Sequence, residues 1–124
     1  MAKSNILIVE DEFIIALDFE SRLMQQGDFS TKIVPSGEEA VTKAASENFD
    51  VIFMDIKLMG KMDGIEAAQI IQKKIDVPIV YISGNADLLE SERLKQTHPA
   101  GILKKPVVDY EINEVLKIVC PKED

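Results

Sequence analysis

Reactive side chains follow four of the short apolar runs of this 124-residue sequence. Glu10 and Asp11 follow the first run, Asp55 follows the third, Ser83 the fourth and Lys105 the fifth. An ionised aspartate can act as a nucleophile, carboxylate oxygens suit Mg²⁺, and a hydroxyl and an amine can balance phosphoryl oxygens. This combination favours the transfer of a phosphoryl group onto an aspartate, with Mg²⁺ as cofactor.

Each of these residues also has an ordinary structural explanation. Asp11 suits a helix N-cap, Ser83 suits a turn, and Lys105 suits a solvated surface position. Asp55 fits the N-cap explanation poorly, because a stretch without helical pattern extends from Ile56 to Asp63. The prediction of a site therefore depends on whether all of these side chains reach one place.

The apolar runs alternate with amphipathic segments five times, which predicts their common position. Runs without two-residue alternation are typical of strands buried on both faces, and they comprise 6–9, 32–34, 51–54, 79–82 and 101–103. Helical patterns cover about 12–26, a segment that opens at Ser36, 65–75, a weaker 87–96, and 112–119. The alternation predicts an α/β fold, a doubly wound parallel sheet with helices on both faces. The reactive residues then share the carboxyl edge of the sheet, where such folds place their sites.

Five motifs, in this order and at this spacing, resemble the receiver domain of two-component response regulators. They are Ile-Leu-Ile-Val-Glu-Asp-Glu (6–12), Val-Ile-Phe-Met-Asp-Ile (51–56), Met-Asp-Gly (62–64), Ile-Ser-Gly (82–84) and Lys-Lys-Pro (104–106). The resemblance extends from Asn5 to Val119. It implies a flavodoxin-like five-stranded parallel sheet of order 2-1-3-4-5 with five helices, and a single receiver domain over residues 1–124.

The resemblance also implies a role for each residue of the site. Asp55 would accept the phosphoryl group, Ser83 would direct its hydroxyl to that group, and Lys105 would pair with it. The Mg²⁺ ligands would be Glu10, Asp11, Asp55 and the backbone carbonyl of Lys57.

The implied function is a phosphorylation-dependent signalling switch rather than a turnover enzyme. A sensor histidine kinase would donate from its phosphohistidine, and a downstream effector protein or phosphotransfer domain would receive the signal through an altered surface. A phosphorylation-linked homodimer is a further expected assembly. Three alternatives stay open: an aspartyl-nucleophile phosphatase or phosphotransferase, a flavin-binding module, and an interaction module that does not depend on phosphorylation. Lys57 counts against the first, since such hydrolases commonly carry a second aspartate at that position.

Two departures from the family pattern concern the switch. The usual aromatic residue three positions before the lysine is Ile102, so an aromatic rotamer change there cannot report phosphorylation. Lys57 and Asn85 each lie two residues after a site residue, Asp55 and Ser83. We hypothesise that this pair tunes the lifetime of the acyl phosphate.

Composition excludes several other classes of protein. The net charge of −8 and the pI near 4.7 count against direct contact with nucleic acid. No apolar run approaches the roughly 20 residues that span a bilayer. A single cysteine, Cys120, cannot form an internal disulfide, which favours the cytoplasm. His98 precedes Pro99, which disfavours a helix there, so His98 is predicted to be structural rather than a phosphodonor.

Overall fold

The computed structural model describes residues 3–121 as a parallel sheet and its covering helices. The strands are β1 (Ser4–Val9), β2 (Phe29–Val34), β3 (Val51–Asp55), β4 (Ile79–Ser83) and β5 (Gly101–Lys104). Their order is β2-β1-β3-β4-β5, and every neighbouring pair is parallel. The predicted fold and strand order are confirmed.

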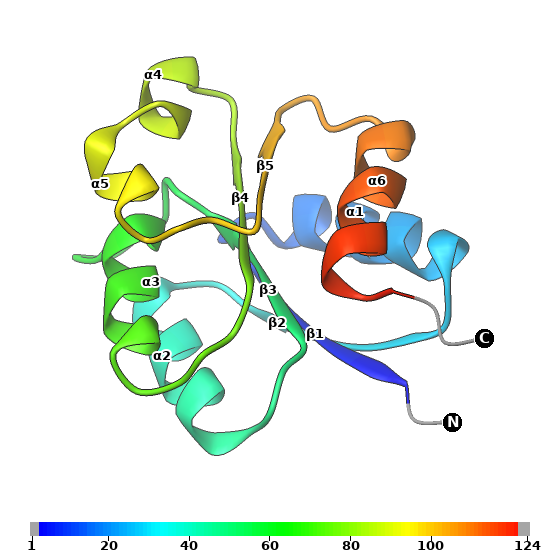
Figure 1. The fold of residues 1–124 in the computed structure, drawn as a ribbon, viewed down its shortest axis with the longest axis horizontal. Helices are drawn as coiled ribbons and strands as arrows, with labels where there is room; N and C mark the ends of the chain where they lie inside the picture. The colour runs from blue at the N-terminus through cyan, green and yellow to red at the C-terminus, as the bar shows by residue number, and fades with distance from the viewer. Residues whose placement is uncertain (1–2, 122–124) are drawn as a thin grey trace.

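Helices cover both faces of this sheet (Figure 1). They are α1 (Phe13–Gln26), α2 (Gly37–Ser46), α3 (Gly64–Gln72), α4 (Ala86–Leu89), α5 (Glu92–Lys95) and α6 (Asp109–Val119). Buried side chains of α1 and α6 form one core with the sheet, and those of α2, α3, α4 and α5 form a second core on the opposite face. Among residues 3–121, no helix has both the length and the apolar character that crossing a membrane requires.

Burial of the strands follows their place in the sheet. All residues of β3 and β4 are buried, as the unbroken apolar runs predict. The edge strands β2 and β5 each expose part of their length, because each has a neighbour on one side only. The expectation of burial on both faces is therefore right for the central strands and wrong for the two edges.

The fourth predicted helix, over about 87–96, is two short helices in the structure. The side chain of Asn85 caps α4 by accepting hydrogen bonds from the backbone N–H groups of Asp87 and Leu88. Ser91 then caps α5 by accepting from Leu94 N–H at 3.3 Å. A second capping residue within the segment restarts the helix, because its side chain satisfies the free N–H groups of a new first turn.

The apolar residues that predict α1 from sequence, which include Phe13, Ile14, Leu17 and Met24, lie largely on its exposed face. Phe13, Ile14 and Leu17 expose 63%, 81% and 42% of their surface. The helix instead buries Ala16, Phe19 and Leu23 against the sheet. The boundaries of α1 are as predicted. Helical periodicity alone leaves undecided which face of α1 packs against the sheet, since both faces carry apolar residues.

Candidate phosphoryl-acceptor site

The carboxyl edge of the sheet gathers the three predicted acidic residues. Asp55 is the last residue of β3, and Glu10 and Asp11 directly follow β1, the neighbouring strand. Carboxylate oxygens of these three residues all lie within 4.8 Å of one another. Because parallel neighbouring strands end at the same level, Asp55 joins Glu10 and Asp11 in a single cluster although it lies far from them in sequence.

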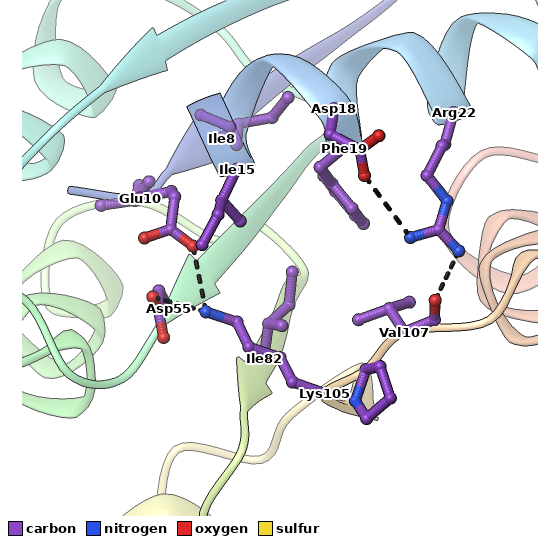
Figure 2. Close-up of a pocket in the computed structure, with 13 residues that line it drawn as sticks. Ile8, Glu10, Ile15, Asp18, Phe19, Arg22, Asp55, Ile82, Lys105 and Val107 are labelled. Carbon is purple, nitrogen blue, oxygen red and sulfur yellow. Dashed lines mark hydrogen bonds and ion pairs between the residues drawn. The ribbon is translucent and has the colours of Figure 1, made fainter. Parts of the chain in front are cut away.

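Lys105 completes this cluster from the far side of the sheet edge. Its Nζ lies 3.0 Å from Glu10 Oε1 and 3.1 Å from Asp55 Oδ2 (Figure 2). The Lys105 backbone N–H also donates to the Ser83 carbonyl at 2.9 Å, which fixes the start of the loop after β5. The prediction that Lys105 stands at the site, and not in free solvent, agrees with these contacts.

The four charges shift one another's ionisation. Burial and the neighbouring Glu10 charge raise the pKa of Asp55 to about 7, although Lys105 acts in the opposite direction. Burial likewise raises the pKa of Asp11, with a further contribution from Glu10. Burial disfavours ionised Glu10 too, but the Glu12 N–H and Lys105 outweigh it and hold the pKa of Glu10 below its usual value. Burial opposes the charge of Lys105, yet its two carboxylate partners raise its pKa.

Such a cluster suits a divalent cation. Carboxylate oxygens are the protein ligands that Mg²⁺ prefers, and Mg²⁺ keeps several waters, so a few carboxylates at one spot are enough. Three carboxylates beside a single ammonium leave an excess of negative charge at the edge of the sheet. The chemistry of these donors therefore fits Mg²⁺.

A polar cleft of about 650 Å³ opens above this cluster. Ser83 lies on its wall, and its Oγ accepts a hydrogen bond from Asn85 N–H at 3.0 Å. A hydroxyl that accepts still has its own proton to donate, so Ser83 can also bind an anionic oxygen. A Cβ on Gly84 would meet only Lys105 Cβ, at 3.8 Å, so this residue leaves the cleft open.

The loop between β3 and α3 contains a close approach that supports Asp55. A Cβ on Gly64 would lie 2.1 Å from the Asp55 carbonyl oxygen, so only glycine fits where α3 begins. Gly64 N–H donates to the Ile56 carbonyl at 2.8 Å. Asp63 caps α3 through Glu66 N–H at 2.8 Å and is itself held by Arg93. The pattern Asp-x-x-Glu at 63–66 is a signal that could have revealed this cap from sequence.

The other residues singled out from the sequence lie either beside the cleft or away from it. Lys57 is exposed beside the cleft, and Asn85 lines it while capping α4. His98 is exposed in a left-handed turn with φ 52°, outside the helices, as expected for a residue before Pro99. Ile102 exposes 43% of its surface on β5. Cys120 is half-buried, and burial raises the pKa of its thiol.

Comparison with known proteins identifies the family. The model of the response regulator receiver domain matches residues 6–117. The chain belongs to the response regulator receiver domain family. It is 32% identical over 116 residues to the transcriptional regulatory protein PdtaR of Mycobacterium tuberculosis, covering 92% of this chain and 54% of PdtaR. It is 29% identical to the heme response regulator HssR of Staphylococcus haemolyticus, covering 89% of this chain and 47% of HssR. The chain therefore spans about half the length of these relatives.

A similar solved structure addresses the metal. The receiver domain of the sensor histidine kinase PA1611 from Pseudomonas aeruginosa has a TM-score of 0.84 to this chain and 29% identity, covering 95% of this chain and 98% of that one. That structure has a magnesium ion coordinated in the active-site cleft. Receiver domains bind Mg²⁺ in an acidic pocket, and this chain has such a pocket in Glu10, Asp11 and Asp55. Receiver domains are signalling modules that interact with histidine kinases and downstream effectors, and they are generally not turnover enzymes.

Proposed function

We propose that Asp55 of this receiver domain accepts a phosphoryl group from the phosphohistidine of a sensor histidine kinase. The observation that carries the proposal is the position of Asp55, within 4.8 Å of two further carboxylates and 3.1 Å from the Lys105 ammonium. An Asp55 oxygen forms the new P–O bond as the P–N bond of the donor breaks, and the donor imidazole keeps the bonding electron pair. The whole chain, residues 1–124, then acts as a single receiver domain.

The residues of the site would divide the work as follows. Glu10, Asp11, Asp55 and the backbone carbonyl of Lys57 would hold Mg²⁺, which offsets the negative charge of the incoming group when bound. Lys105 would exchange its contact with Asp55 for a phosphoryl oxygen. Ser83 would turn its hydroxyl proton toward another phosphoryl oxygen, while its Oγ can continue to accept from Asn85 N–H. Both movements are at the carboxyl ends of β4 and β5.

This rearrangement would pass to the surface formed by α4, α5, β5 and α6. Only Gly84 and Asn85 separate Ser83 from α4, Asn85 is the N-cap of α4, and α5 follows α4 in the chain. Segments of four residues depend on their caps and on a few buried side chains, so a shift at Ser83 changes their stability easily. A downstream effector or phosphotransfer domain, or a second copy of the chain, would bind the altered surface.

The test is phosphorylation of the isolated chain by acetyl phosphate with Mg²⁺, followed by intact mass. Wild type should gain about 80 Da, and Asp55→Asn should not. A gain that persists in Asp55→Asn would refute the assignment of Asp55. Continuous turnover of a generic phosphomonoester would favour the phosphatase alternative, and absorbance from bound flavin would favour the flavin-binding alternative.

A further inference from the structure

The loop that carries Lys105 lies across a cavity from α1. The loop joins the end of β5 at Lys104 to the start of α6 at Asp109. A cavity of about 230 Å³ separates it from α1, and Figure 2 shows Ile15 and Phe19 on one side with Val107 on the other. Protein interiors normally hold their elements in place by close packing. Here side-chain packing does not by itself fix the distance between the loop and the helix.

Arg22 bridges this space with hydrogen bonds. Its Nη2 donates to the Val107 carbonyl (Figure 2). Its Nε donates to Asp109 Oδ1 at 2.7 Å. Val107 is two residues after Lys105, and Asp109 is the first residue of α6. One planar guanidinium therefore holds the loop at two points, in the fixed geometry that arginine provides.

The loop after β5 is held on one side by Arg22 and on the other side by β4. There the Lys105 N–H donates to the Ser83 carbonyl at 2.9 Å, so β4 holds the beginning of the loop. Between these anchors the Lys105 side chain extends back to Glu10 and Asp55. The position of the ammonium thus depends on where both anchors hold the backbone.

We propose that Arg22 is a positioning residue for the phosphoryl transfer, which sets the place of the Lys105 ammonium by bridging α1 to the loop after β5. The inference rests on the proposed roles of Asp55 and Lys105. Arg22 acts through geometry, because Asp109 at 2.7 Å and Asp18 at 3.9 Å already balance its charge. Sequence gives no sign of this role, since Arg22 and Val107 are 85 positions apart.

The test is a double-mutant cycle between Arg22→Met and Lys105→Ala. The readout is the initial rate at which acetyl phosphate and Mg²⁺ phosphorylate the full chain, followed by intact mass. We expect Arg22→Met to slow the rate about tenfold, since a misplacement of roughly 1 Å in a group that contacts the reacting atoms can cost about a hundredfold. In the Lys105→Ala background the same change should alter the rate less than about twofold, because no ammonium remains to be positioned.

Two further measurements separate positioning from general destabilisation. The dissociation constant for Mg²⁺, measured by calorimetry, should not rise more than about twofold in Arg22→Met, since Lys105 is not a metal ligand and a displaced ammonium repels the cation less. Asp109→Asn keeps a hydrogen-bond acceptor and the fold of α6, and should slow the rate less than Arg22→Met does. The control is Lys43→Met, which removes a cation with one ion pair, to Glu47 at the end of α2, and should leave the rate within about twofold.

Equal slowing by Arg22→Met with and without Lys105 would overturn the inference, as would an unchanged rate in Arg22→Met alone. Failure of wild type to gain the phosphoryl group, or a gain that Asp55→Asn retains, would instead refute the proposed function, and the inference with it. The two failures are therefore distinguishable in one set of variants.

Discussion

Asp55→Asn should stabilise the folded protein at neutral pH in the absence of Mg²⁺. The Asp55 side chain exposes only 8% of its surface, and Glu10 beside it exposes 7%. Folding therefore places a buried carboxylate next to another, and raises the pKa of Asp55 from 3.8 to about 7. Asparagine has nearly the same shape without the charge, so the substitution removes the cost of burying a carboxylate and the repulsion from Glu10.

The magnitude follows from the difference in pKa between the unfolded and folded chain. Each pKa unit corresponds to about 1.36 kcal/mol, so the increase in the pKa of Asp55 from 3.8 to about 7 corresponds to about 4 kcal/mol. This difference already includes the charge and the hydrogen bond of Lys105, both of which lower the pKa of Asp55. We expect an increase of about 2–4 kcal/mol in the free energy of unfolding.

The pH dependence has a definite sign. Because the folded pKa of Asp55 is above its unfolded pKa, this group binds more protons in the folded chain between about pH 4 and pH 7, and its contribution to wild-type stability falls as pH rises through that window. The advantage of Asp55→Asn should accordingly be largest above about pH 7 and disappear near pH 4. Mg²⁺ should stabilise wild type more than the variant, because it binds the ionised carboxylate of the folded state.

The assay is urea unfolding followed by circular dichroism, since the chain contains no tryptophan. Wild type and variant are compared at about pH 5 and about pH 8, each with a chelator and with Mg²⁺. Asp76→Asn, at an exposed position outside the site, serves as the control. The reasoning is wrong if Asp55→Asn is less stable than wild type at the higher pH without Mg²⁺, or if the gap is the same at both pH values.

Three further predictions concern other parts of the structure. Gly64→Ala should lower the free energy of unfolding by about 2 kcal/mol or more, because its Cβ would meet the Asp55 carbonyl oxygen at 2.1 Å. Gly84→Ala is the control: its nearest contact is at 3.8 Å, and it should cost less than about 1 kcal/mol. Equal effects of the two variants in urea unfolding would contradict the close approach at Gly64. Tyr81→Phe should cost about 1 kcal/mol in the same assay, because the buried hydroxyl lies 2.6 Å from Thr97 Oγ1, and a neutral result would show that this bond adds nothing. Lys57→Ala and Asn85→Ala should change the half-life of the phosphorylated chain by a few-fold or more, and the hypothesis of lifetime tuning fails if both half-lives, measured by intact mass, equal that of wild type.

The sequence by itself determined the fold and the place of the site. The alternation of apolar runs with helical patterns specified a parallel sheet, although the strand order came only from the family resemblance, and the carboxyl ends of parallel strands share one edge whatever the loops between them do. Asp55, Glu10 and Lys105 could therefore be assigned to one site before any distance was known. Their chemistry could be predicted too, because it depends on residue type and on nearness to the strand ends.

Only the tertiary structure decided which face of α1 is buried, how the fourth helix divides, and what supports the site. Apolar residues on both sides of α1 predict a helix but not which side is buried. In the folded chain, Ala16, Phe19 and Leu23 pack against the sheet. The bridge from Arg22 to Val107 joins residues far apart in sequence, and no local pattern encodes such a pair. The raised pKa of Asp55 is likewise a property of burial and of neighbouring charges, which exist only once the chain has folded.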